Sequence, residues 1–154
     1  MRFFARLLGW ATLFALPCWL LMVPYQRALG TVVEWWLGVL GVAVVVDDVS
    51  VAAPLDLGLF AALTLSESGP GARPARTLGR GLPTLVGLEI LAVSGSILIA
   101  LPFVGSPAAL STIQRLISHG IEAIPWMSAV VVWLALSGAR RSFSGEGPPV
   151  RWAR

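Results

Sequence analysis

Three residues of the chain belong to types that together can do covalent chemistry: a thiol, a guanidinium and an imidazole. Cys18 lies in an apolar run, while Arg115 and His119 are four residues apart and so share one face of a predicted helix. Such a set could supply the nucleophile, oxyanion stabiliser and base of an intramembrane thiol peptidase. However, no motif flanks Cys18, and a lone cysteine in an apolar helix commonly serves as a small packing residue. We therefore predict no enzyme and no catalytic residue, with the thiol peptidase as an alternative.

Two acidic residues lie inside predicted membrane helices. Burying an ionisable side chain there is energetically unfavourable, so such residues commonly have a function. Asp56 and Glu89 could therefore serve a small transporter or channel subunit. The structural alternative is that each acid forms an ion pair with an arginine on its own side of the membrane. The candidate partners are Arg6 or Arg80 for Glu89, and Arg27 or Arg115 for Asp56.

Other chemical motifs are missing from the sequence. It contains no glycine-rich phosphate loop, nucleotide fingerprint or metal-ligand spacing, and its single cysteine excludes an intrachain disulfide. We therefore expect no cofactor and no metal site. The net charge of +3 comes from arginine alone. Because these arginines cluster at the ends of apolar segments, their charge does not indicate a nucleic-acid partner.

The composition is that of a protein that lies in a lipid bilayer. Of 154 residues, 56% are hydrophobic and only 12% charged, and the mean hydropathy is +0.82. A soluble domain of this size carries about a quarter charged residues. We predict an all-α membrane protein, a small bundle of about four transmembrane helices with an interfacial or extended extracytoplasmic segment. The predicted spans are residues 3–23, 52–66, 82–104 and 119–138.

These spans form one predicted domain over residues 1–138, and a disordered basic cytoplasmic tail follows over 139–154. The first span could be a signal peptide, but no A-x-A-like cleavage site follows it, so we expect a retained helix. Residues 31–46 are an alternative second span, with 52–66 then re-entrant.

The arginines predict the orientation of the bundle. In the four-span arrangement only Arg27 and Arg115 fall outside, and the other nine arginines fall inside. Clustered arginine stays on the cytoplasmic side. We therefore expect a multi-pass membrane protein with both termini and the polar loop 67–81 in the cytoplasm.

The third predicted span carries a stripe of small residues. Glu89, Ala92, Ser96 and Ala100 recur on one side of the predicted helix. Small residues four apart let another helix approach closely. We predict that this stripe faces the bundle, that Glu89 faces inward with it, and that Pro83 lies in the first helical turn.

The segment before the second span is predicted to lie outside the cytoplasm. Adjacent tryptophans beside an acid suit the lipid headgroup region, and the β-branched run at 42–51 favours an extended backbone. An amphipathic helix at 110–121 approaches the same side. We predict a docking surface for a membrane partner there, the alternative being that these segments rest on lipid headgroups. Its predicted residues are Trp35, Trp36, Arg115 and His119.

The order of these segments resembles a known family. The segment APLDLGLFAAL at 53–63 leads into a basic loop, and IEAIPW at 121–126 precedes a last helix with VVWL. This pattern, over most of residues 1–138, resembles the exosortase H-associated membrane proteins. The resemblance implies a non-catalytic accessory protein of the bacterial cytoplasmic (inner) membrane that belongs to an exosortase-type protein sorting system. An exosortase or another membrane protein is the implied partner. The chain lacks the Ala-Cys-small-Gly setting of the exosortase nucleophile, so no role passes to Cys18.

The orientation can be tested with a reporter that is active only outside the cytoplasm. Fused after Arg154, the reporter is expected to be inactive, because the arginine distribution keeps this end inside. Fused after Asp48, it is expected to be active. Activity of the Arg154 fusion would contradict the orientation, as would cleavage of residues 67–81 by a protease added from outside.

Overall fold

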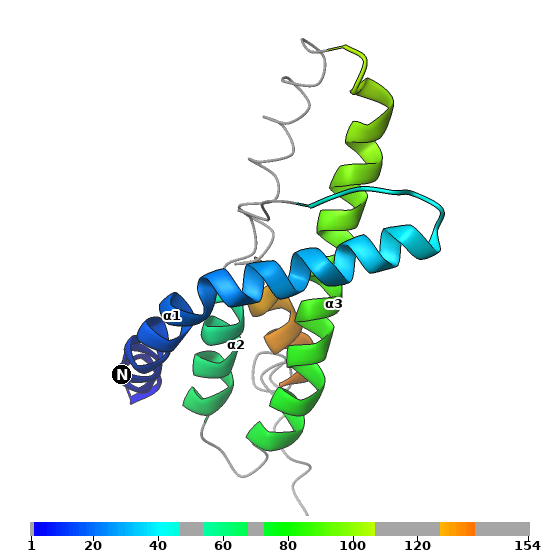
Figure 1. Cartoon of the computed structure of the whole chain (residues 1–154). Coiled ribbons are helices and arrows are strands. Elements are labelled where there is room, and N and C mark those ends of the chain that lie inside the picture. Colours follow the sequence, from blue (N-terminus) through cyan, green and yellow to red (C-terminus); the bar gives the residue numbers. More distant parts are fainter. Residues whose placement is uncertain (1, 47–53, 68–72, 107–126, 138–154) are drawn as a thin grey trace, which may run out of the picture.

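The computed structural model describes residues 2–46, 54–67, 73–106 and 127–137, and within these ranges the chain is helical with no strand. The all-helical prediction is confirmed for this part of the chain. The elements are α1 (Arg2–Val39), α2 (Leu55–Ser66), α3 (Pro74–Ala100), the short 3-10 helix η1 (Leu101–Phe103) and a further helix, Met127–Leu136, orange in Figure 1.

The first helix is much longer than the predicted span 3–23. It continues through Pro24 to Val39, so the prediction that the first helix ends at residue 23 is wrong. Interior proline weakens a helix because it removes one backbone hydrogen bond. The inward side of α1 nevertheless continues through this point, from Cys18 through Met22 to Tyr25 and Leu29, at a spacing of three to four residues. Packing of this continuous face stabilises the helix across the proline.

A glycine turn ends α1 and sends the chain back. Gly41 has a φ of 79°, the left-handed region that favours glycine. The amide of Val42 donates to the carbonyl of Leu37 at 2.9 Å, and that of Gly41 to Gly38 at 3.0 Å, which together form a Schellman motif.

Residues 42–46 then return along the outside of α1 and alternate between half-buried and exposed side chains. Val42, Val44 and Val46 pack against a cluster of Leu29, Val33, Leu37 and Val93. This alternation is that of an extended backbone and agrees with the prediction for 42–51, whose residues beyond 46 lie outside the described ones. The Val46 amide donates to Oε1 of Glu34 at 2.7 Å, which fastens the segment to α1.

The short helix α2 is the centre of the bundle. None of its residues is exposed, although it has only 12 residues. Figure 1 shows α2 beside α3, with α1 crossing both. Phe60 of α2 joins Leu85 of α3 and Ala129 and Val132 of the last helix in a second apolar cluster. A helix too short to span a bilayer is therefore shielded on all sides by its neighbours.

The third helix begins earlier than predicted. Pro74, and not Pro83, occupies its first turn, so the predicted start at residue 82 is wrong. Residues 74–81, assigned to a polar loop, are helical because each long arginine side chain can extend away while the small and apolar residues pack inward. Arg76 and Arg80 are exposed, whereas Thr77 and Gly81 are buried.

Two contacts bring three chain segments to one end of the molecule. The rings of Phe3 and Trp133 lie 6.2 Å apart, between the start of α1 and the last helix. Ser137 forms a hydrogen bond with the carboxyl of Glu67, just beyond α2. Burial raises the pKa of Glu67, and this hydrogen bond acts in the opposite direction. The start of α1, the end of α2 and the end of the last helix therefore share one end.

The close approach of α2 and α3 depends on a glycine. A Cβ atom at Gly81 would overlap the ring of Phe60, whereas one at Gly87 on the same helix would meet nothing within 4 Å. Gly81→Ala is expected to reduce stability by about 1–3 kcal/mol, as overpacking does. Gly87→Ala is the matched control and should leave stability unchanged or raised, since alanine favours helix. Thermal unfolding of the purified variants measures both effects. Equal stability of the two would contradict this packing.

Candidate functional site

Three helices each bring one polar side chain to the same place in the interior. Tyr25 comes from α1, Asp56 from the first turn of α2 and Glu89 from the middle of α3. Asp56 is 1% exposed and Glu89 6% exposed, and Tyr25 is half-buried. We call these three residues the polar triad. Ionisable groups so deeply buried in apolar surroundings need polar partners to be stable.

The partners come largely from the triad itself. The hydroxyl of Tyr25 donates a hydrogen bond to Oε2 of Glu89. Oδ1 of Asp56 accepts from the amide of Leu57 at 2.7 Å, in the first turn of α2. The carboxyl groups of Asp56 and Glu89 lie within hydrogen-bonding reach of each other. The triad therefore links α1, α2 and α3 through polar contacts.

Two oxygens of the triad are left without a partner in the described part of the chain. They are Oδ2 of Asp56 and Oε1 of Glu89, one on each carboxyl group. A buried polar atom without a hydrogen bond is destabilising by about 1–3 kcal/mol. These two oxygens are thus the atoms of the triad that need a hydrogen-bond donor.

The predicted ion pairs are not what the structure contains. Glu89 is bonded to Tyr25, whereas Arg6 and Arg80, its predicted partners, are exposed. Arg27 is exposed too, and the other partner predicted for Asp56, Arg115, lies outside the described residues. The pairing prediction for Glu89 is wrong because Arg6 and Arg80 lie near the starts of their helices, far along the bundle from Glu89.

The thiol is a packing group in this structure. Cys18 lies on the inward side of α1, and a Cβ atom added to Gly58 of α2 would come within 2.7 Å of its Sγ. The absent side chain at Gly58 thus makes room for the sulfur. Of the predicted chemical set, Arg115 and His119 lie outside the described residues, so the thiol peptidase alternative stays a prediction.

The small-residue stripe differs in part from the prediction. Five of the six buried residues of α3 recur every four positions, as Thr77, Gly81, Leu85, Glu89 and Val93, and the sixth is Ser94. Glu89 is common to both sets. Ala92, Ser96 and Ala100 are half-buried, and the Ser96 hydroxyl bonds to the carbonyl of Ala92 at 2.7 Å. Beyond Val93 it is Ile97 that packs against the first apolar cluster. The face of α3 that carries these residues, spaced four apart, therefore contacts the neighbouring helices.

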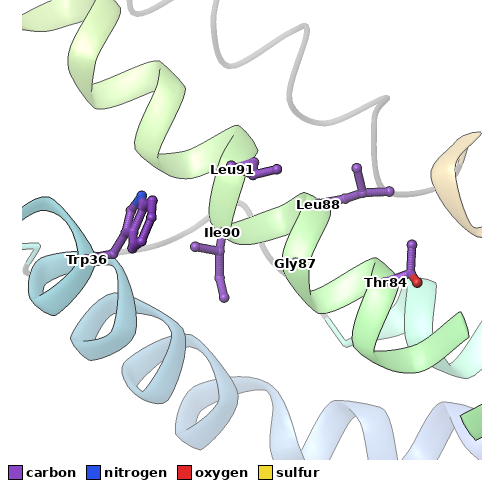
Figure 2. A pocket seen from close by; sticks show the side chains of 6 residues that line it. All are labelled: Trp36, Thr84, Gly87, Leu88, Ile90 and Leu91. Atoms are coloured by element: carbon purple, nitrogen blue, oxygen red, sulfur yellow. The ribbon is translucent and has the colours of Figure 1, made fainter. Parts of the chain in front are cut away.

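An open apolar groove lies between the end of α1 and the middle of α3. Its volume is about 430 Å³. Figure 2 shows Trp36 of α1 and Ile90 of α3 on either side of it, with Gly87 contributing no side chain. The side chain of Trp36 is 38% exposed, whereas that of its neighbour Trp35 is 68% exposed. The lining residues are Trp36, Thr84, Gly87, Leu88, Ile90 and Leu91.

Among the described residues, no group of three or more histidine, cysteine, aspartate or glutamate side chains could hold a metal ion. Comparison with protein-family models, curated proteins and solved structures gave no match. The triad and the groove are therefore interpreted from their own chemistry.

Sequence reasoning missed Tyr25, the one residue that connects α1 to the acids. The chain has a single tyrosine, and it is seven residues from Cys18, two helical turns along the same face. That spacing was the available signal. It was not used because the helix was expected to end at residue 23.

The Tyr25–Glu89 hydrogen bond can be tested by removing only the hydroxyl. Tyr25→Phe leaves a third carboxyl oxygen unsatisfied and is expected to reduce stability by about 1–3 kcal/mol. Thr12→Val is the control, because the Thr12 hydroxyl is exposed and bonds to its own helix at 2.8 Å. In a double-mutant cycle with Glu89→Leu, most of the loss caused by Tyr25→Phe should disappear. Additive effects in thermal unfolding would contradict the bond.

Proposed function

We propose that this chain is a multi-pass integral membrane protein that acts by binding a second membrane protein and has no turnover of its own. The observation that carries the proposal is the distribution of polarity. Acidic groups are gathered in the interior as the polar triad, and large apolar side chains cover the outside of α1 and α3. That arrangement suits helices that are surrounded by lipid and by other helices.

Length and composition support the membrane location. Two helices, Arg2–Val39 and Pro74–Phe103, are long and apolar enough to cross a bilayer, with mean hydropathies of 1.8 and 2.1 in their most apolar windows. In α1, none of the 18 residues of the most apolar stretch is buried inside the molecule. The eight large apolar side chains exposed along its first half would be unfavourable in water. They are Phe4, Leu8, Leu13, Leu16, Trp19, Leu20, Leu21 and Val23.

The contacts at one end of the molecule support the proposed orientation. The start of α1, the end of α2 and the end of the last helix meet there through Phe3, Trp133, Glu67 and Ser137. The start of α3 follows Glu67 in the chain after a short connection. The arginines at this end are exposed, as expected for a cytoplasmic face. Those described are Arg2, Arg6, Arg73, Arg76 and Arg80.

The partner is proposed to bind at the far end of α1. Trp35 there is 68% exposed and Val45, on the returning segment, 80% exposed, in a surface with Trp36, Val39 and Leu40. Tryptophan is enriched in binding surfaces because it supplies a large apolar area and one polar edge. An apolar transmembrane helix of another protein fits this surface and the adjoining groove. The resemblance to exosortase-associated proteins, which rests on sequence pattern, makes an exosortase-type sorting protein the first partner to test.

The partner surface can be tested by co-purification from membranes. Trp35→Ala combined with Trp36→Ala is expected to reduce recovery of a co-expressed exosortase-type partner at least tenfold, because two central apolar contacts are lost. Trp19→Ala is the matched control, since Trp19 is an equally exposed tryptophan on the other half of α1. All variants should insert and accumulate like the wild type.

Two results would contradict the proposal. Equal loss with Trp19→Ala would show that lipid anchoring, and not docking, is measured. Proton-coupled flux by the purified protein in liposomes, abolished in Glu89→Gln, would favour the transporter alternative.

A further inference from the structure

The two unsatisfied carboxyl oxygens of the triad are complementary to one positive charge. Oδ2 of Asp56 and Oε1 of Glu89 each lack a donor among the described residues, and their carboxyl groups lie within hydrogen-bonding reach of each other. The remaining two oxygens are occupied, by the amide of Leu57 and by the hydroxyl of Tyr25. A single added donor between the groups would therefore satisfy both orphan atoms.

Neither nearby group of α1 can be that donor. The Tyr25 hydroxyl has one proton, which is already directed at Oε2 of Glu89. The thiol of Cys18 is the other titratable group that acts on Asp56, and a thiol is a weak donor that carries no positive charge. The described arginines are exposed and cannot neutralise the pair.

Electrostatics excludes leaving the pair as two carboxylates. Like charges at hydrogen-bonding distance in an apolar interior repel strongly, and each also loses its hydration. Paired carboxyl groups elsewhere in proteins resolve this conflict by holding one proton between them. A metal ion would need more ligands than the described residues offer here.

We propose that Asp56 and Glu89 form a proton-binding site that holds one proton between the two carboxyl groups and so joins α2 to α3. The proton comes from water. When bound, it makes one carboxyl group a donor to the other and leaves a single negative charge, which the Tyr25 hydroxyl stabilises. When it leaves to water, two carboxylates face each other and α2 and α3 are driven apart. The site does not depend on the proposed partner.

The depth of the site agrees with this role. From Arg80, the last arginine of α3, to Glu89 the helix rises about 14 Å, and from Asp56 to the end of α2 about 15 Å. Measured from the arginine-rich end, both acids thus lie near the middle of a bilayer core about 30 Å thick. Water cannot hydrate a second charge there, so a retained proton is the simplest way to keep both acids buried.

Infrared spectroscopy of the full-length protein in lipid nanodiscs tests the proposal. At neutral pH the wild type is expected to show the C=O stretching band of a buried protonated carboxyl group. The band should disappear in Glu89→Gln and in Asp56→Asn, because either amide supplies the donor and removes the need for the proton. Glu34→Gln is the control and should keep the band, since Glu34 bonds to the amide of Val46.

The same variants make a stability test that does not rely on spectroscopy. Raising the pH should lower the unfolding temperature of the wild type as the shared proton is lost. At least half of this shift should be absent in Glu89→Gln, whereas Tyr25→Phe and Cys18→Ser should retain it, because they leave the carboxyl pair in place. Four groups face the site: Cys18 and Tyr25 from α1, Asp56 from α2 and Glu89 from α3.

Several outcomes would overturn the inference. One is a wild-type spectrum at neutral pH without the band, which needs no variant to fold. Another is an unchanged pH-dependent shift in Glu89→Gln. A third is stabilisation of the wild type by sodium chloride, relative to choline chloride, with loss of the band, because the site would then bind a metal cation and not a proton.

Discussion

The packing of this protein depends on one constraint: two carboxyl groups, from different helices, are buried together where water does not reach them. Asp56 and Glu89 can occupy that position only if their oxygens find donors in the interior. The donors available are the hydroxyl of Tyr25 and the backbone at the start of α2. Each comes from a fixed place on its helix. Apolar side chains such as leucine and valine would pack almost as well after a shift of one turn, but these polar contacts would not survive it. The triad therefore selects one register among α1, α2 and α3.

Glycines make that register physically possible. Gly58 leaves room for the sulfur of Cys18, and Gly81 leaves room for the ring of Phe60. Gly58 lies on α2 and Gly81 on α3, and they allow α2 to approach α1 and α3 closely. Because α2 has only 12 residues and no exposed side chain, it cannot adjust by turning a different face to the bundle. Small residues and buried acids thus act as one set, with glycine permitting the approach that the carboxyl groups require.

Composition and apolar runs predicted the helices well but predicted their ends poorly. Clusters of leucine and valine gave an all-helical chain, because hydropathy is a property of long segments. The end of a helix depends on whether local breakers, such as proline, outweigh the packing of that helix against its neighbours. Pro24 was expected to end the first helix, yet the inward face from Cys18 to Leu29 packs on both sides of it. Arg76 and Arg80 indicated a loop, yet they extend from the exposed side of α3. Neither outcome can be read from residue type alone, because tertiary packing decides both.

The polar triad was also predictable only in part, because the partner of a buried acid depends on tertiary packing. Buried acids are rare enough that Asp56 and Glu89 stood out from the sequence, whereas their partner did not. Arginine was the predicted partner because opposite charges attract. However, the arginines lie near the ends of the helices, at a different depth from the two acids. A tyrosine on the inward face could reach them, and its hydroxyl has no charge to bury. The general point is geometric: in a long apolar helix, a residue pairs with what lies at its own depth, and depth follows from the helix rise of 1.5 Å per residue.

The same arrangement bears on where function can reside. Few polar side chains are buried in the described bundle, and Tyr25, Asp56 and Glu89 contact one another, which leaves little in the interior to recognise a hydrophilic ligand. The outside of α1, by contrast, carries large apolar side chains from Phe4 to Val39, interrupted by a few polar residues, and near Trp36 the groove and the returning segment adjoin it. Lipid chains can cover a smooth apolar helix without any defined shape. A surface with a groove, two tryptophans and a fastened backbone segment has the features by which one membrane protein distinguishes another. Recognition is therefore expected at the end of α1, while the triad keeps the helices beneath it in register.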